Sequence, residues 1–400
     1  MTKPADFRRV TKADVYKAGR LAATLVRTAD GGTEFTYRSE YLASADEPIA
    51  TTLPMRSAPV LNASGAIPPF FAGLLPEGHR LTVLRRAAKT SADDELTLLL
   101  AVGGDVPGDV QIVPEGQAPM DPPALLEDGE PDDVEFARLV DDVDPHAIPG
   151  VQRKASASMI SLPFSSHDGR FILKLSQPEY PHLLENEAAH LQAARTMKLP
   201  VAEASLVADR TGEPGLLVRR FDRFLDNRSW ERLAFEDGSQ VLGIPPAAKY
   251  QADTETVVSA LAALTSAPLV AIRNLYMQFL FAWLTGNGDL HAKNVGVLKD
   301  RRGRWAIAPI YDIPCTLLYD DDSMALPING RTRKLRARDW AAFATEIGLP
   351  ERAAASAAQV VLRAAAGIEY ARLPFEGSPL HRTERELRSR RVEIEIPLRA

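Results

Sequence analysis

The chain has 400 residues, 45% of them hydrophobic and 25% charged, which is an ordinary globular composition with room for two or three domains of about 100–200 residues each. Its net charge of −6 argues against a wholly basic nucleic-acid binder, and its single cysteine, Cys315, excludes an intramolecular disulfide framework and a cysteine-based zinc cluster. The segment Met1 to Val10 is polar, and no apolar stretch approaches the ~20 residues that a membrane-spanning helix needs. We therefore expect a soluble, cytoplasmic protein without membrane association.

Residues 1–113 combine strand-like and helical patterns and are predicted to form a small α+β domain. Arg20–Val26 and Thr33–Tyr37, separated by a turn at Asp30–Gly32, are typical of a β-hairpin. Phe70–Arg86 is helical in pattern but interrupted at Pro76–Gly78, and Glu95–Val102 predicts a buried helix.

Residues 114–144 differ in composition from their surroundings. This segment holds eleven Asp or Glu residues against one basic residue, Arg138, and is rich in proline. Such a segment buries little apolar surface, so we interpret it as a linker with a solvated acidic surface; an acidic binding arm is the alternative.

Residues 145–400 are predicted to form the second domain, divided into residues 145–228 and residues 229–400. Its first part predicts two strands, one helix over His182–Lys198 and two further strands. Its second part is mainly helical, and a broad apolar face from Ile272 to Leu284 predicts a helix in the core.

A polar loop, Gly286–Asn294, follows that apolar helix directly. Asp289 and Asn294 are five residues apart, the separation between the catalytic Asp and the metal-binding Asn of protein kinases. An Asp in that place reaches the attacking hydroxyl, and the Asn reaches Mg²⁺ on the ATP phosphates. The alternative is that both side chains only stabilise turns. Asp312, expected at the end of a strand over Ile307–Ile310, is a candidate second Mg²⁺ ligand.

Lys174 lies on a predicted strand, and Glu187 lies thirteen residues later on the following helix. Protein kinases hold the α- and β-phosphates of ATP with such a Lys–Glu pair. Upstream, Gly150 precedes Val151, Gln152, Arg153 and Lys154, whose backbone N–H groups are candidates for a phosphate loop.

Several motifs in order resemble the HipA family, the serine/threonine-kinase toxins of bacterial HipBA toxin–antitoxin systems. Phe71–Gly78 is similar to the family's N-terminal signature, and Gly104–Gln111 to the motif that closes the N-terminal domain. The remaining matches are the phosphate loop Gly150–Lys154, the hinge Arg220–Arg223 with Glu236–Gln240 after it, the catalytic loop Gly286–Asn294, and Tyr311-Asp312.

The resemblance implies a two-lobed protein-kinase-like catalytic domain of PI3/4-kinase-like lineage, preceded by a small α+β HipA N-terminal domain. By position it makes Asp289 the catalytic Asp, makes Asn294 and Asp312 ligands of Mg²⁺, and places Lys174 on the ATP phosphates. It also implies that the backbone near Phe221 contacts adenine. His291 matches a histidine of the family's catalytic loop; a structural histidine that hydrogen-bonds the loop is the other explanation.

Two positions depart from the family pattern. Studied toxins autophosphorylate a serine three residues before the phosphate-loop glycine, where this chain has Ala147, although Ser156 and Ser158 are nearby hydroxyls. The hinge residue before Arg220 is usually acidic, and here it is Arg219.

Three functions remain open at this point. The first is an ATP- and Mg²⁺-dependent protein kinase toxin that phosphorylates a Ser or Thr hydroxyl, with an aminoacyl-tRNA synthetase as one possible substrate. This reading implies a HipB-like helix-turn-helix antitoxin, through which DNA is contacted indirectly. The second is a kinase of the same fold that acts on a small molecule. The third is a non-catalytic module that binds a repressor antitoxin.

Two charged segments complete the analysis. The basic run from Arg331 to Arg338 is expected to be a solvated surface, with an acidic partner or nucleic acid as the alternative. Glu384–Arg391, with mixed charges, is expected to be a solvent-facing helix.

Overall fold

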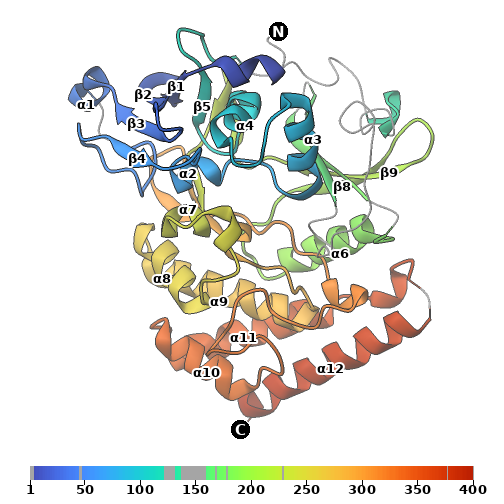
Figure 1. The fold of residues 1–400 in the computed structure, drawn as a ribbon. Helices are drawn as coiled ribbons and strands as arrows, with labels where there is room; N and C mark the ends of the chain where they lie inside the picture. Colours follow the sequence, from blue (N-terminus) through green and yellow to red (C-terminus); the bar gives the residue numbers. More distant parts are fainter. Residues whose placement is uncertain are drawn as a thin grey trace.

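A computed structural model describes most of the chain at the level of individual residues. The described residues are 4–44, 47–120, 131–136, 159–166, 169–176, 179–227, 229–375 and 377–399. Strand-rich parts occupy one end of the molecule, and the helices α9 to α12 occupy the opposite end (Figure 1).

The N-terminal unit, residues 4–120, is built on an antiparallel five-stranded sheet of order β4-β3-β2-β1-β5. The predicted hairpin is confirmed, because β2 and β3 pair with Leu25 opposite Phe35. One face of the sheet is apolar and buried, because the short helices pack against it. The elements are β1 (Lys12–Lys17), β2 (Arg20–Arg27), β3 (Thr33–Tyr37), α1 (Ser39–Ser44), β4 (Val60–Asn62), α2 (Pro69–Ala72), α3 (Gly78–Ala88), α4 (Glu95–Val102) and β5 (Val110–Pro114).

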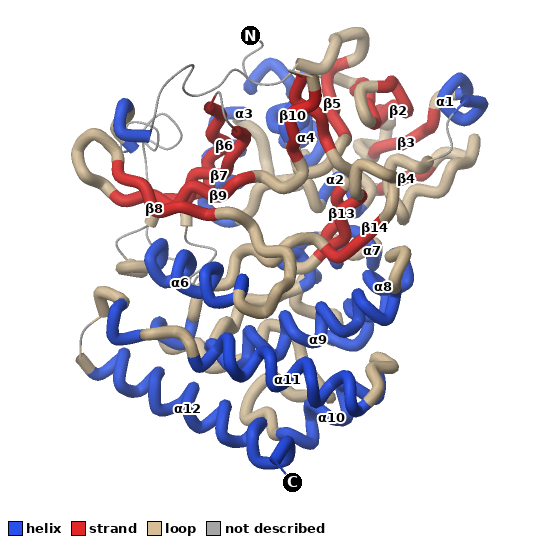
Figure 2. The backbone as a smooth tube through the Cα atoms, turned by 180° about the vertical axis from the view of Figure 1, so that it is seen from behind, coloured by secondary structure: helices blue, strands red, loops and turns tan. Residues whose placement is uncertain are grey.

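The next unit is an antiparallel four-stranded sheet of order β6-β7-β9-β8 with one helix, α6, below it (Figure 2). The predicted succession of two strands, a helix and two strands is confirmed. Leu183 and Leu184 of α6 are fully buried and pack in one cluster with Leu216 of β9. The elements are β6 (Ile160–Ser166), β7 (Gly169–Leu175), α6 (Leu183–Arg195), β8 (Ala204–Ala208) and β9 (Pro214–Arg219).

Part of the acidic segment, residues 131–136, is described. Phe136 is buried and packs with Leu162 and Leu173 of the four-stranded sheet. Its main-chain N–H donates to Asp209 at 2.8 Å. At this point the segment is anchored on the sheet rather than fully solvated.

The remaining residues, 223–399, form two small sheets and a stack of helices. α9 is the central helix, and Leu275, Phe279 and Trp283 on it are almost completely buried, as its apolar pattern predicts. The elements are β10 (Arg223–Asp226), β11 (Ser229–Arg232), β12 (Phe235–Asp237), α7 (Gly238–Leu242), α8 (Thr254–Leu264), α9 (Pro268–Thr285), β13 (Gly296–Lys299), β14 (Trp305–Ile307), α10 (Ala337–Glu346), α11 (Glu351–Ala366) and α12 (Ser378–Arg399).

Two sequence expectations are corrected here. β14 ends at Ile307, so Asp312 lies in a loop beyond the strand rather than at its end. The helix α12 is not merely solvent-facing: Leu387, Arg390 and Ile394 are buried. The basic run behaves as expected, because Arg331, Arg333, Lys334, Arg336 and Arg338 are all exposed.

Within the described ranges, no helix combines the length and the apolar character that crossing a bilayer requires.

Candidate functional site

A cavity of about 350 Å³ lies where three parts of the chain meet. The four-stranded sheet contributes Pro163, Ile172 and Val218, and the helical part contributes Tyr311 and Asp312. The third wall comes from the N-terminal unit, through Gly73–Glu77, Arg80, Val102 and Asp105–Pro107. The lining surface is mainly apolar, but eleven of the 25 described residues that line it carry charged side chains, so the cavity joins an apolar wall to a charged one.

Lys174 is the central charged group of this cavity. Its neighbours Leu173 and Leu175 are buried in the sheet, so strand alternation turns Lys174 to the opposite face. Its ammonium donates to both carboxylate oxygens of Glu187 on α6, at 2.7 and 2.9 Å, and to Asp312 at 2.9 Å. Three residues that are distant in sequence therefore meet at one point.

Burial and charge shift the pKa values of this triad in different directions. Burial disfavours the charged form of Lys174, but the carboxylates of Asp312 and Glu187 raise its pKa above the ordinary value. Burial likewise opposes ionisation of Asp312, yet Lys174 keeps the pKa of Asp312 below its usual range. Burial raises the pKa of Glu187, whose charge Lys174 only partly compensates. Lys174 is thus a charged group at neutral pH.

The backbone of Asp312 has a left-handed conformation, with φ of +55°. A non-glycine residue in this region costs roughly 1 kcal/mol or more, and such strain concentrates at functional sites. The preceding Tyr311 fixes the loop, because its hydroxyl donates to the carbonyl of Lys293 at 2.6 Å.

The predicted catalytic loop begins where α9 ends at Gly286, whose φ of +74° suits glycine. Asp289 is 2% exposed and its N–H donates to Asn287 Oδ1 at 2.8 Å. The amide nitrogen of Asn294 donates to the carbonyl of Asp289 at 3.0 Å. The loop is therefore held by its own side chains, and turn stabilisation is one real function of Asn294.

His291 is buried in the same loop. Its ring lies edge-on to Tyr250, with centroids 5.0 Å apart. Burial lowers the pKa of His291 to about 3, so the imidazole is neutral at physiological pH. Within the described part of the chain, its Nδ1 has no hydrogen-bond partner.

Phe221 lines the same cavity and contacts Tyr311, the residue before Asp312. The centroid of its ring lies 5.6 Å from that of Phe235 and 5.6 Å from that of Tyr311. The centroids of Phe235 and Tyr311 are 6.3 Å apart, so the three rings form one aromatic cluster. The neighbouring Arg219 also lines the cavity, and its guanidinium pairs with Glu203 at 3.0 Å and lies 4.9 Å from the centroid of the Phe171 ring. The arginine at the usually acidic hinge position is thus accommodated on the sheet surface.

The structure brings together Lys174, Glu187 and Asp312, and places Asp289, His291 and Asn294 in one loop. Phe221 lines the same cavity as the triad. The phosphate-loop candidates Val151, Gln152, Arg153 and Lys154 lie outside the described residues, as do Ala147, Ser156 and Ser158.

Sequence reasoning missed a set of charged contacts beneath the catalytic loop. Lys293 Nζ donates to the carbonyl of Gly73 at 2.6 Å and to Asp237 at 3.1 Å. Glu77, on the N-terminal unit, forms an ion pair with Lys249 and lies 3.9 Å from Lys293. The sequence signal was weak, because charged residues in polar loops are usually solvated.

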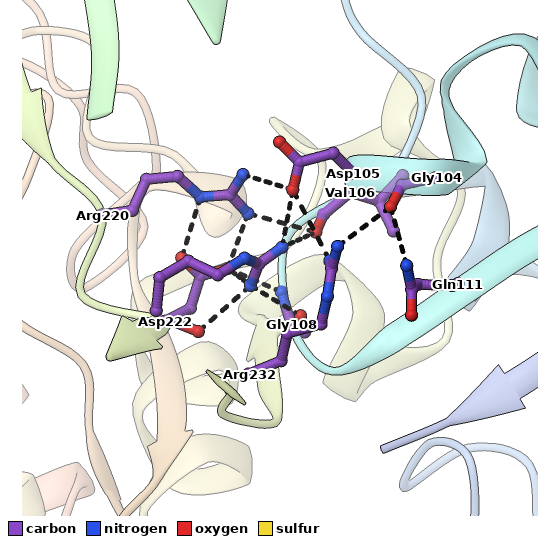
Figure 3. A network of polar contacts seen from close by, with 9 residues as sticks. Gly104, Asp105, Val106, Gly108, Gln111, Arg220, Asp222 and Arg232 are labelled. Carbon is purple, nitrogen blue, oxygen red and sulfur yellow. Dashed lines mark hydrogen bonds and ion pairs between the residues drawn. The ribbon is translucent and has the colours of Figure 1, made fainter. Parts of the chain in front are cut away.

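The hinge is also tied to the N-terminal unit, by the network of Figure 3. Asp105 accepts from Arg220 at 2.8 Å and from Arg223 at 2.9 Å. Asp222 accepts from both arginines and from the N–H of Gly108. The hinge residues therefore form a contact between the N-terminal unit and the rest of the chain.

Asn294 and Asp312 offer oxygen donor atoms of the kind that a magnesium ion prefers. Mg²⁺ uses one or two protein oxygens together with water and phosphate oxygens. The amide nitrogen of Asn294 is used inside the loop, which leaves its amide oxygen as the donor atom, and Asp312 is ionised. No group of three or more His, Cys, Asp or Glu side chains suited to a metal occurs among the described residues.

Comparison with known proteins gives consistent matches along the chain. The family models match the HipA N-terminal domain at residues 13–113 and the HipA-like C-terminal domain at residues 146–368. A Sinorhizobium fredii protein named "Putative kinase Y4mE" is 30% identical over 367 residues, covering 84% of this chain and 86% of that protein. The serine/threonine-protein kinase toxin HipA of Shewanella oneidensis is 26% identical, covering 76% of each chain.

A solved structure shows the same fold. It is the Shewanella oneidensis HipA in complex with HipB and its operator DNA, with a TM-score of 0.75 and 22% identity, covering 95% of this chain and 96% of that one.

Fold and cavity define a mixed α and β protein in which three parts of the chain enclose one charged site. The chain belongs to the HipA family. Kinase activity is a property of this family, as the names of its members state.

Proposed function

We propose that this chain is an ATP-dependent serine/threonine-protein kinase of HipA type. The single observation that carries the proposal is Lys174, which is held between Glu187 and Asp312 at the cavity wall. A strand lysine fixed by a helix glutamate beside a metal-binding aspartate is the arrangement that kinases use on ATP phosphates.

In this proposal the four-stranded sheet unit is the N-lobe, and the helical part is the C-lobe, of a PI3/4-kinase-like catalytic domain. Adenine would contact the backbone near Phe221, between the aliphatic wall of Ile172 and Val218 and the aromatic rings of Phe235 and Tyr311. In support, the main chain of Phe221 takes part in no backbone–backbone hydrogen bond among the described residues.

At the phosphate end, Lys174 would compensate the charge of the α- and β-phosphates, with Val151–Lys154 as the phosphate loop. Mg²⁺, held by Asn294 and Asp312, would neutralise the charge that develops on the transferred phosphoryl group. Asp289 would orient the acceptor hydroxyl, and because the transition state is loose, positioning matters more than basicity. The buried, neutral His291 lies in the same loop and would shield it from water.

The family supplies the biological setting of the proposal. The solved relative was determined with HipB and operator DNA, so we propose a HipB-like antitoxin partner and indirect DNA contact for this chain as well. The substrate would be a protein hydroxyl, with an aminoacyl-tRNA synthetase as one candidate.

The test compares phosphoproteomes of cells that express wild type, Asp289→Ala or Asp312→Ala. We expect new Ser or Thr phosphopeptides with wild type and none with either variant, because positioning and charge compensation are lost. Asp226→Ala serves as the matched control, since Asp226 pairs with Arg301 at the surface and its side chain is 49% exposed.

Other outcomes separate the alternatives. Phosphotransfer to a small molecule, without phosphopeptides, would favour the small-molecule kinase. Failure of purified wild type to bind Mg-ATP would favour the non-catalytic antitoxin-binding module. Wild-type phosphorylation by the Asp289→Ala variant would refute the assignment of the catalytic Asp.

A further inference from the structure

Tyr250 contacts the candidate catalytic aspartate directly. Its hydroxyl donates to Asp289 Oδ1 at 2.8 Å, from a loop that precedes α8. The tyrosine ring packs edge-on against His291, at an interplanar angle of 81°. The ring thus lies beside the catalytic loop, while 36% of the residue remains exposed.

This hydrogen bond is charge-assisted and persists over the physiological pH range. Burial and the adjacent Asp289 carboxylate raise the pKa of Tyr250 above its ordinary value, so the phenol stays protonated and donates. A carboxylate with one oxygen fixed cannot rotate freely, and its second oxygen then has a defined direction. In phosphoryl transfer that direction decides whether the acceptor hydroxyl is in line.

The residue before Tyr250 is paired with the N-terminal unit. Lys249 forms an ion pair with Glu77, which follows α2 at the cavity wall. The ammonium of Lys249 also lies 5.2 Å from the centroid of the Tyr250 ring. Glu77 lies 3.9 Å from the ammonium of Lys293, so one carboxylate contacts the loop of Tyr250 and the catalytic loop.

We propose that Tyr250 is a positioning residue for Asp289, and that the N-terminal unit sets its place through the Glu77–Lys249 ion pair. The inference rests on the proposed kinase function and deepens it: the N-terminal unit is part of the catalytic apparatus rather than an appended module. Glu77 belongs to the Phe71–Gly78 signature, so the proposal also assigns that signature a physical role at the active site.

The first test is Tyr250→Phe in the full-length chain, which removes the hydroxyl and keeps the ring against His291. We expect kcat for phosphotransfer to fall about tenfold, the change that corresponds to one hydrogen bond to a charged group. The affinity for Mg-ADP should stay at the wild-type value, because Tyr250 is not among the described residues that line the cavity. A merely structural role would lower the melting temperature and leave the kcat of the folded protein unchanged.

The matched control is Tyr319→Phe. The hydroxyl of Tyr319 donates to the carbonyl of Pro181 at 2.9 Å, away from the catalytic loop, so its loss should leave kcat unchanged. A Tyr250→Phe variant with the kcat of wild type would overturn the positioning role.

The second test is a double-variant cycle with Glu77→Gln, which keeps the shape of the side chain and removes its charge. If the ion pair holds Tyr250, the effect of Tyr250→Phe on kcat should be clearly smaller in the Glu77→Gln background. Equal, additive effects would overturn the link to the N-terminal unit while leaving the Tyr250–Asp289 contact intact.

These results are distinguishable from failure of the proposed function. A wild-type chain that transfers phosphate to no acceptor would contradict the kinase assignment itself. An active wild type with an equally active Tyr250→Phe variant would contradict only the positioning role.

Discussion

His190 is a buried titratable residue that the proposed chemistry does not use. Its ring nitrogens lie 2.7 Å from the carbonyl of Asn186 and 3.1 Å from the hydroxyl of Tyr370. Burial lowers the pKa of His190 to about 4, so the native state holds the neutral form. The side chain of Asn186 also hydrogen-bonds the main chain of Cys315, so this histidine lies where α6 contacts the loop after Asp312.

We therefore predict that the free energy of unfolding decreases as the pH is lowered. The pKa of His190 is about 4 in the native state and about 6.5 when unfolded, so between these values the unfolded chain binds the extra proton. The His190 contribution is complete above pH ~6.5, and about 3 kcal/mol is lost as the pH falls towards 4. Urea unfolding at several pH values should show a shallower acid slope for His190→Gln than for wild type. The exposed His381→Gln is the control and should retain the full slope.

At the scale of elements, α12 shows how a highly charged segment becomes part of the core. Its buried residues Leu380, Thr383, Leu387, Arg390 and Ile394 are spaced by three or four, which gives one buried stripe. Arg390 is buried because its guanidinium lies 3.7 Å from the centroid of the Trp283 ring and donates to the carbonyl of Trp283. A charged residue thus occupies a position that hydrophobic periodicity alone would not include.

We expect Leu387→Ala to lower the free energy of unfolding by about 2–5 kcal/mol, because it leaves a cavity next to Cys315 and Leu317. Chemical denaturation measures the change. Arg388→Ala, one residue further and exposed, should change stability by less than about 0.5 kcal/mol. An effect of Leu387→Ala as small as that of Arg388→Ala would contradict the packing role of α12.

At the scale of the whole molecule, buried charges join the N-terminal unit to the hinge. Asp105 contacts Arg220, Arg223 and, at 3.5 Å, Arg232. Burial disfavours ionisation of Asp105, but these guanidinium groups hold its pKa below the usual range. The two units therefore depend on each other for charge compensation, and we expect them to unfold together.

Asp105→Asn keeps the shape of the side chain and removes its charge. Because it removes one of the two carboxylates that compensate the buried charges of Arg220 and Arg223, we expect a loss of about 3–5 kcal/mol in the free energy of unfolding. Guanidinium denaturation followed by tryptophan fluorescence reports the change. Glu203→Gln breaks an exposed ion pair with Arg219 and should cost less than about 1 kcal/mol. If Asp105→Asn were equally mild, the network would not join the units.

Local patterns in the sequence predicted most of the elements that frame the site. The β2–β3 hairpin, the strand of Lys174, the helix of Glu187 and the apolar helix α9 follow from periodicity and turn residues. The convergence of Lys174, Glu187 and Asp312 was expected from motif spacing and family resemblance. Helix ends shifted by a few residues: α6 ends at Arg195 rather than Lys198, since short-range patterns define helix termini poorly.

The sequence by itself determined which residue types carry the proposed chemistry, because a strand lysine, a helix glutamate and a polar loop after a buried helix each leave a local pattern. The tertiary structure decided that the N-terminal unit forms a wall of the cavity and that Tyr250 contacts Asp289. Glu77 and Lys249 are 172 residues apart, and in sequence each has the pattern of an ordinary surface charge. Only packing of the units brings the two side chains together and buries that of Lys249, so no local pattern could predict the pair.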